Sequence, residues 1–230
     1  MDATRRPLSR DRVLTTAVRI ADRDGLAALT MRSLAAELGV KPMSLYHHVR
    51  NKEEILDGIV DAVFAEIDLP DPAAGWRAQV RRRAVSARVV LARHPWALTL
   101  MESRTNPGPA TLRQHDTMLA TFLQAGFSLQ ATAHAYAVLD AYVYGFALQE
   151  ASLPFGDADD VPEVAEPIMD RMPMEEYPNM ARFAMEHAMK PGYSFGASFE
   201  VGLDLVLDGL ARLRSTGDGD GEREGDGEAW

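Results

Sequence analysis

Apolar side chains recur along this chain at the three- and four-residue spacing of helices, and no segment alternates apolar and polar residues as a strand would. The first such segment follows Ser9, a residue type that caps helix N-termini, and stops at Gly25. Its apolar positions are Val13, Leu14, Ala17, Val18 and Ala21. Because the same spacing continues through most of the chain, we expect an all-α protein.

Capping residues mark three further helices in the N-terminal quarter of the chain. Thr30 can cap a short second helix that Gly39 ends, and Pro42 suits the first turn of a third helix, where its missing N–H has no partner to lose. Asn51, followed three residues later by Glu54, resembles a capping box and opens a fourth, long helix.

The breaker cluster LPDPAAG (69–75) separates these helices from the rest. Beyond it, the spacing predicts helices over 76–92, 95–103, 108–125, 128–151 and 195–214. The proline- and acid-rich segment 152–180 predicts a long loop with one or two short helices. The expected organisation is an N-terminal domain at 1–52, a fourth helix and body at 53–214, and a disordered acidic tail at 215–230.

The formal net charge of the 230-residue chain is −10, but the charge is unevenly placed. Residues 1–52 carry ten Lys or Arg against five Asp or Glu, a balance of +5, whereas residues 53–230 carry 14 against 29, a balance of −15. A basic end on an acidic body indicates that only the N-terminal part meets a polyanion. The run RRR at 81–83 could be a second polyanion site, but pairing with the acidic body is the simpler interpretation.

Composition excludes several kinds of site. The chain has no cysteine, which rules out disulfides, thiolate nucleophiles and cysteine-ligated metals. No apolar run approaches the roughly 18 residues of a membrane-spanning helix, and the N-terminus is too charged for a secretory signal. We therefore expect a cytoplasmic protein.

The segment 30–48 has the residues that two packed helices joined by a tight turn require. Ala35 is small where the second helix crosses the first, and Gly39 tolerates the positive φ of the turn. The inward apolar positions are Leu34, Leu38, Val40 and Leu45. Such spacing also occurs in unrelated helix pairs, but here it falls within the basic segment. Together the two features predict a DNA-binding helix-turn-helix.

In that geometry the second helix, at about 42–48, lies in the major groove of DNA. Its outward side chains, which we predict to contact base edges, are Met43, Ser44, Tyr46, His47 and His48. Arg32 is placed to reach a guanine. Thr30, Arg50 and Lys52 are placed for phosphates, and Lys41 completes the predicted DNA-binding set.

Two adjacent histidines, His47 and His48, raise the alternative of metal or catalytic chemistry. Neighbouring helix residues point about 100° apart, and no Asp or Glu stands at ligand spacing on the same face. The remaining histidines are scattered without a nucleophile beside them: His94, His115, His134 and His187. We therefore expect no metal, no cofactor and no enzyme activity, and assign His48 to DNA, with solvation as the alternative for His47.

The run LTMRSLAAELGVKPMSLYHHVRNKEEIL (29–56) resembles the DNA-binding domain of the tetracycline-repressor (TetR) family, with Tyr46, His48 and Lys52 at the family's spacing. Further segments resemble the C-terminal domain of tetracycline repressor and its relatives: 93–96, 126–150 and 191–210. The resemblance implies an all-helical homodimer whose three N-terminal helices bind a palindromic operator, whose fourth helix connects, and whose body holds a ligand cavity. It also implies operator contacts for Arg32, Ser44, Tyr46 and His48, and a phosphate contact for Lys52.

One departure from the family pattern concerns the start of the recognition helix. The family's proline directly precedes the residue that corresponds to Ser44, whereas here Pro42 lies one position earlier and Met43 intervenes. The base preference of this chain is therefore open.

Glycines in the body favour a helix-packing interface. Gly196, Gly202 and Gly209 recur about every two helical turns in the predicted helix 195–214, and each glycine inside a helix costs about 1 kcal/mol. Close backbone approach would explain them. We expect this helix and 128–151 to form a two-fold dimer interface; packing within one monomer is the alternative.

The resemblance places the cavity among the helices predicted between residues 76 and 151. Candidate lining residues are Trp96, Leu100, Met101, Met118, Phe122, Tyr136 and Asp140. A lining of Met and aromatic residues suits an apolar or aromatic small molecule, although each residue could equally belong to the core.

The resemblance does not extend to the tetracycline ligands. Where the antibiotic sensor has two histidines that grip a drug–Mg²⁺ complex, this chain has Asp68 and either Met101 or Glu102, and Gln149 replaces a carboxylate near the metal. We therefore expect neither tetracycline nor a metal. The predicted function is a repressor released by a small molecule; the alternatives are an activator, a repressor without a natural ligand, or a helical interaction scaffold.

Overall fold

The computed structural model describes residues 7–101, 103–154 and 161–216, and within these ranges the chain forms helices and no strand. The helices are α1 (Arg10–Asp24), α2 (Met31–Leu38), α3 (Pro42–Leu45), α4 (Lys52–Glu66), α5 (Trp76–Arg93), α6 (Leu98–Met101), α7 (Pro109–Gln124), α8 (Leu129–Ala151), α9 (Val161–Met169), α10 (Pro178–Phe183) and α11 (Ser198–Thr216). Short 3-10 turns lie at Leu26–Ala28, Pro95–Ala97 and Phe195–Ala197, and a π turn at Ala184–Ala188. The expected all-α class is confirmed.

Local side-chain chemistry sets the starts of the longer helices. The side chains of Ser9, Thr30, Asn51 and Ser128 accept hydrogen bonds from the first turns of α1, α2, α4 and α8. Gly39 ends α2 in the left-handed conformation at φ 66°, which lets the chain turn sharply into α3. These signals act within a few residues, which explains why the sequence located the boundaries well.

Two expected helices are shorter in the structure. The predicted helix at 95–103 is a 3-10 turn followed by α6, which ends at Met101. The predicted recognition helix at 42–48 is regular only to Leu45, because Tyr46 N–H bonds to the Met43 carbonyl and so tightens the last turn. Tyr46, His47 and His48 therefore lie in the turn that follows α3.

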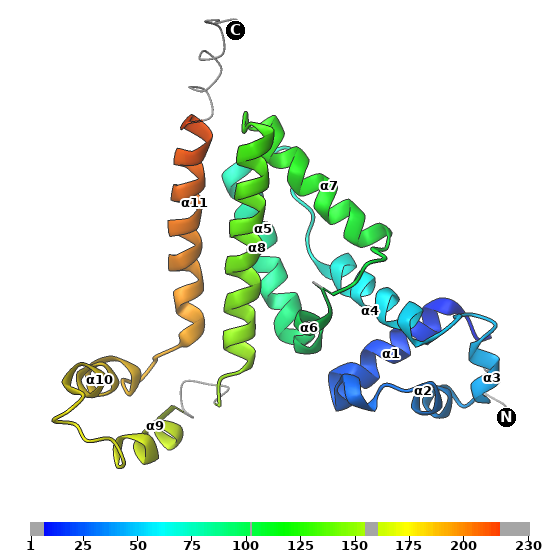
Figure 1. Cartoon of the computed structure of the whole chain (residues 1–230), viewed down its shortest axis with the longest axis horizontal. Coiled ribbons are helices and arrows are strands. Elements are labelled where there is room, and N and C mark those ends of the chain that lie inside the picture. Colours follow the sequence, from blue (N-terminus) through cyan, green and yellow to red (C-terminus); the bar gives the residue numbers. More distant parts are fainter. Residues whose placement is uncertain (1–6, 102, 155–160, 217–230) are drawn as a thin grey trace, which may run out of the picture.

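The helices form two parts joined by α4 (Figure 1). We name the part that carries the predicted helix-turn-helix the DNA-side unit, and the other part the body. Helices α1 to α3 pack together at one end, while α5, α7, α8 and α11 form the body, with α8 packed on the other three. Helix α4 packs against α1 on the DNA side and against α7 in the body. Its residues Ile55, Ile59 and Val63 are buried, so α4 belongs to the core of both parts.

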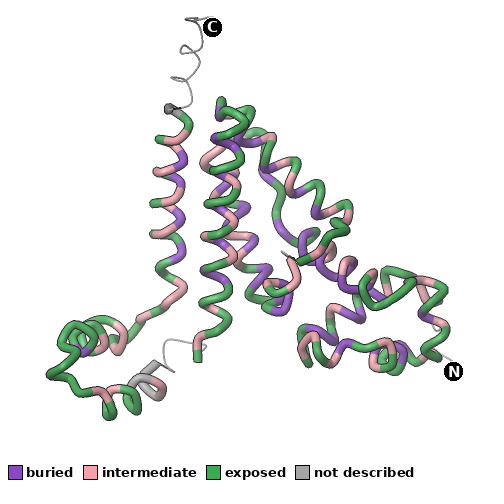
Figure 2. The backbone as a smooth tube through the Cα atoms, in the orientation of Figure 1, coloured by how far each residue is buried: buried purple, intermediate pink, exposed green. Residues whose placement is uncertain are grey.

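The segment from α9 to α10 lies beside the lower end of the body and is largely exposed (Figures 1 and 2). Of the one or two short helices expected within 152–180, α9 lies inside the segment, and α10 begins in it at Pro178 but ends at Phe183. The disordered tail was predicted to begin at residue 215, but Ser215 and Thr216 belong to α11; the rest of the predicted tail lies outside the described residues. None of the described helices is long and apolar enough to span a membrane.

The three arginines at 81–83 form ion pairs within the chain, as we expected if they pair with the acidic body. Arg81 on α5 pairs with Glu200 and Asp204 on α11. Arg82 lies 3.6 Å from a carboxylate oxygen of Asp68, and the fully buried Arg83 pairs with Asp140 on α8.

The three glycines have different environments. A Cβ on Gly202 would collide with the Tyr142 ring of α8, and one on Gly196 would collide with the Arg88 side chain. Both glycines therefore serve packing within one protomer, and Gly196 lies in the turn before α11 rather than inside the helix. Gly209 has no neighbouring atom within 4 Å of an added Cβ. It is the one of the three whose surroundings leave room for another molecule.

Candidate DNA-binding and effector sites

The apolar residues predicted to pack the helix-turn-helix lie at the contact between α2 and α3. Leu34 and Ala35 of α2 and Leu45 of α3 are buried at the crossing of the two helices. Val40 in the turn is partly buried against the same core. The outer surface of α3 and its flanks is thereby left open.

The predicted DNA contacts lie on and around that outer surface. Met43 is 72% exposed and Tyr46 47% exposed, although both are large and hydrophobic. Ser44 and His48 are partly buried, and the other members are exposed: Thr30, Arg32, Lys41, His47, Arg50 and Lys52. Thr30 also has a structural task, because its side chain caps α2 in a capping box with Ser33.

Arg50, just before α4, offers a hydrogen-bond donor beside this surface. Asn51 accepts a hydrogen bond from Glu54 N–H, and the Glu54 carboxylate in turn accepts from the backbone N–H and side chain of Arg50. These bonds, the backbone one first, hold the pKa of Glu54 below its usual value. The Arg50 side chain is 87% exposed, so this ion pair is weak and leaves Arg50 available to a phosphate.

A polar contact ties α1 to the body near residue 94. Asp22 of α1 accepts a hydrogen bond from Trp96 Nε1 at 2.6 Å and lies 2.7 Å from Nδ1 of His94. The other His94 nitrogen lies 3.3 Å from Glu66 at the end of α4. Since His94 and Trp96 are buried, this contact fixes the DNA-side unit on the body.

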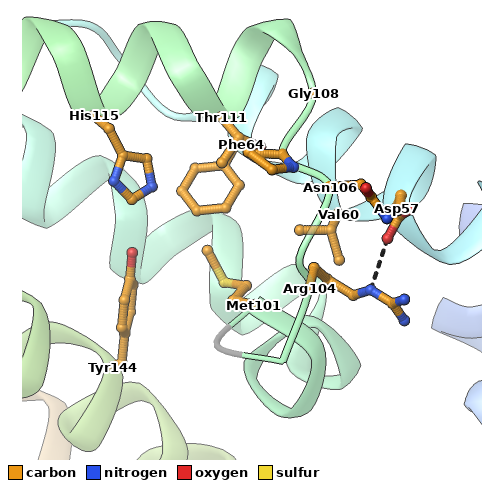
Figure 3. A pocket seen from close by; sticks show the side chains of 11 residues that line it. Asp57, Val60, Phe64, Met101, Arg104, Asn106, Gly108, Thr111, His115 and Tyr144 are labelled. Carbon is orange, nitrogen blue, oxygen red and sulfur yellow. Dashed lines mark hydrogen bonds and ion pairs between the residues drawn. The ribbon is translucent and has the colours of Figure 1, made fainter.

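Among the cavities of the described residues, two adjoin in the body, and we name each by a helix that lines it. The α4 lobe holds about 270 Å³ (Figure 3). It is lined by Asp57, Val60, Phe64, Met101, Arg104, Asn106, Pro107, Gly108, Thr111, His115 and Tyr144. The α8 lobe holds about 590 Å³ and is lined by Leu98, His115, Tyr136, Ala137, Asp140, Ala141, Tyr144, Gly145 and Leu148.

His115 and Tyr144 line both lobes, which therefore adjoin at these two side chains. His115 Nδ1 lies 2.8 Å from the Tyr136 hydroxyl, and its ring centroid lies 5.7 Å from that of Phe64. Burial, and then the charge of Asp140, raise the pKa of Tyr136, so its hydroxyl stays protonated and can donate. The shared lining is therefore aromatic, with hydrogen-bonding groups at its edges.

Comparisons with known proteins agree with this architecture. The family described as "Tetracyclin repressor-like, C-terminal domain" matches residues 69–214, and "Bacterial regulatory proteins, tetR family" matches residues 13–59. The chain is 34% identical to the HTH-type transcriptional repressor DrrR1 of Streptomyces coeruleorubidus, over 92% of this chain and 83% of that protein. The chain belongs to the TetR family.

Other TetR-family proteins are similar over most of their length. The class C tetracycline repressor of Escherichia coli is 28% identical over 91% of this chain and 93% of its own. The crystal structure of Streptomyces coelicolor ActR in complex with actinorhodin matches with a TM-score of 0.72 at 28% identity, covering 95% of this chain and all of that one. This TetR-family chain is thus a DNA-binding transcriptional repressor and not an enzyme.

The seven predicted ligand-binding residues separate into lining and core. Met101 lines the α4 lobe, and Tyr136 and Asp140 line the α8 lobe. Met118 and Phe122 are fully buried among core side chains. Trp96 is held by Asp22, as described above, and Leu100 packs partly buried against the core outside both linings.

Several residues that line the lobes were not among the seven predicted from the sequence. Phe64 falls at the apolar spacing of α4, and His115 was one of the scattered histidines. Tyr144 offered a usable signal, because it follows Tyr136 and Asp140 at intervals of four on one face of α8. Arg104 lies in a loop, and its sequence context gave no such signal.

Asp140 does more than line the α8 lobe. It accepts from Nη1 of Arg83 at 3.2 Å, while Nε and Nη2 of this buried guanidinium have no hydrogen-bond partner. Burial alone lowers the pKa of Arg83, but the charge of Asp140, helped by Tyr144 and Tyr136, outweighs it and raises the pKa. Arg83 therefore stays protonated in the core.

The positions compared with the tetracycline ligands are dispersed. Asp68 is exposed after α4, where it pairs with Arg82, and Gln149 is exposed on α8. Glu102 lies outside the described residues, and only Met101 faces a cavity. Among the described residues, no group of three His, Asp or Glu side chains is placed to hold a metal ion.

Proposed function

We propose that this TetR-family repressor is a homodimer that leaves a palindromic operator when a small molecule occupies the two lobes. The observation that carries the proposal is the position of α4. Asp57, Val60 and Phe64 form a wall of the α4 lobe, while the same helix packs against α1 of the DNA-side unit. A ligand that displaces α4 would therefore move the DNA reader, and its preference for the displaced form weakens operator binding by linkage. The binding of actinorhodin by ActR supports a small-molecule effector.

The test uses an operator selected from random DNA with the purified chain. Fluorescence anisotropy of the labelled operator is followed while a panel of aromatic compounds is added. At least one compound should reduce affinity by about 5- to 150-fold, the range of typical allosteric coupling. If no compound does so, the protein represses without an effector. A repressor acting on chromosomal DNA also implies a cytoplasmic location.

Salt dependence tests the DNA surface as a whole. Arg50 and Lys52 from two protomers would neutralise about four phosphates, which predicts a loss of about 10²-fold in affinity between 50 and 200 mM salt. Affinity that stays level across this range would contradict phosphate binding by these residues.

His48→Ala should weaken operator binding by about fivefold or more, because one lost base contact removes about 1–3 kcal/mol. The matched control is His47→Ala, which removes the same side chain from the neighbouring, exposed position and should change affinity less than threefold. Equal losses for the two variants would contradict the assignment of His48 as the reader. Both affinities are measured by anisotropy at one salt concentration.

An apolar stripe on α11 supports the dimer. Val201 and Leu205 are 64% and 68% exposed, and with Gly209 they follow at intervals of four along one helix face. The neighbouring helix α8 exposes Val138 and Leu148 at 50% and 51%. A second copy packed on this surface would bury them, and a two-fold dimer would present two readers about 34 Å apart to a palindrome.

Gly209→Ala tests that interface against Gly202→Ala. An added methyl at Gly209 meets nothing in the protomer, so it should favour the helix but raise the dimer dissociation constant about tenfold by crowding the second copy. At Gly202 the methyl meets Tyr142 and should lower the free energy of unfolding by about 1–3 kcal/mol. Sedimentation equilibrium and denaturant unfolding separate the two effects. A Gly209→Ala dimer as tight as the original would place the interface elsewhere.

A further inference from the structure

The two lobes are parts of one elongated site, because His115 and Tyr144 line both of them. The lobes differ in chemistry. The α8 lobe is mostly apolar, with two tyrosine rings and small or aliphatic side chains of α8, and its carboxylate, Asp140, is already paired with Arg83. The α4 lobe ends at charged groups, Asp57 and Arg104. A ligand that fills both lobes therefore needs an aromatic or apolar body and a polar end.

An ion pair ties the loop before α7 to α4 at the polar end (Figure 3). Arg104 Nε donates to Asp57 Oδ1 at 2.7 Å, and Nη2 donates to Glu53 Oε2 at 2.7 Å. The side chains of Arg104 and Asp57 are only 15% and 17% exposed. Because this pair is shielded from water, it holds α4 more firmly than a surface ion pair would.

The charge at this end is negative in balance. Asp61 lies one helical turn after Asp57 and accepts hydrogen bonds from the N–H and hydroxyl of Thr111, at 2.8 and 2.9 Å. Within the described ranges no Lys or Arg forms an ion pair with Asp61. With the groups that line the adjoining groove between α1 and α4, three arginines (Arg10, Arg50 and Arg104) lie beside five carboxylates, those of Asp11, Glu53, Glu54, Asp57 and Asp61. This field attracts a cation and repels an anion.

We propose that the effector is an aromatic amine, an inference that rests on the function proposed above. Its ring system lies in the α8 lobe, against Tyr136 and Tyr144. Its protonated amine reaches the α4 lobe and takes the place of Arg104 on Asp57. The exchange keeps Asp57 paired with a cation, so no carboxylate is left unpaired in a shielded site. It also breaks the tie between the loop and α4, which frees α4 to move.

A matched set of probes tests the charge of the effector. The probes are 2-(2-naphthyl)ethylamine, 2-(2-naphthyl)ethanol and 2-naphthylacetic acid, which share a ring system and carry a cation, a neutral hydroxyl and an anion. Isothermal titration calorimetry with the full chain, without DNA, should show the amine binding at least tenfold more tightly than the other two. Asp57→Asn should abolish this preference, whereas Asp116→Asn, an exposed carboxylate on α7, should retain it. Acid binding as tight as amine binding would overturn the proposal.

The role of Arg104 as a positioning residue has its own readout. Arg104→Met should weaken operator binding about tenfold in the absence of any probe, because α4 is no longer held, and Arg104→Lys should restore it to within threefold. The control is Arg113→Met, an exposed arginine on α7, which should match the unchanged chain. In addition, the amine should be the only one of the three probes that releases the operator from the unchanged chain. Operator binding by Arg104→Met as tight as that of the Arg113→Met control would overturn the proposal. If the chain bound no operator at all, the proposed function would fail, while the calorimetric preference for the amine would still be measured.

Discussion

Asp140→Ala is expected to lower the free energy of unfolding by about 3–5 kcal/mol, because it leaves the guanidinium of Arg83 buried without its counter-charge. Arg83 is completely buried between α5 and α8, and its Nη1 bond to Asp140 is the hydrogen bond that pairs its charge. Two of its nitrogens already have no hydrogen-bond partner, so the site has little capacity to absorb the loss. Denaturant unfolding at a fixed protein concentration measures the change.

The double variant Arg83→Met/Asp140→Ala supplies the control. It removes both charges and keeps an unbranched side chain in the space of the arginine, so it should be more stable than Asp140→Ala alone. A loss below about 1 kcal/mol for Asp140→Ala would mean that another group compensates Arg83. Because Asp140 also lines the α8 lobe, the same variants show whether effector affinity depends on this carboxylate or only on the fold.

Phe122→Ala is expected to cost about 3–5 kcal/mol of stability, the usual range for deleting a buried aromatic ring. Phe122 is fully buried, with its ring centroid 6.2 Å from that of Trp76 and 5.2 Å from that of Phe127. The three rings join the start of α5 to the end of α7. The variant would leave a cavity that these rigid rings cannot fill.

The neighbouring residue Leu123 provides the matched control for this prediction. It is 43% exposed on the same helix, so Leu123→Ala should change the free energy of unfolding by no more than about 0.5 kcal/mol. If Phe122→Ala unfolds like Leu123→Ala but binds effector poorly, then Phe122 belongs to the ligand site rather than to the core. Denaturant unfolding and calorimetry on the same samples decide between the two.

The candidate DNA surface was predictable because its determinants are local. Thr30, Gly39 and Asn51 act on backbone groups a few residues away, and the apolar spacing of α2 orients its outer face. The exposed positions of Met43 and Tyr46 follow once Leu45 takes the inward position. The length of α3 was harder to predict, because a single i→i−3 bond decides where a helix of one turn ends.

The effector site was predictable only in part. Tyr136, Asp140 and Met101 lie on helices that the family resemblance placed around the cavity, and they were among the candidates. Met118 and Phe122 have the same residue chemistry, yet they point into the core. Periodicity identifies an inward face of a helix, but it does not distinguish a filled interior from a cavity.

By itself the sequence determined the all-helical class, the helix-turn-helix and the basic end that carries it, because periodicity, capping and charge act along the chain. The tertiary structure decided that His115 and Tyr144, 29 positions apart, lie together where two lobes adjoin. It also decided that Arg104 hydrogen-bonds to Asp57, 47 positions away, and that Arg83 is buried against Asp140. Such contacts depend on how helices cross, and crossing geometry is set by the packing of all side chains together rather than by any one segment.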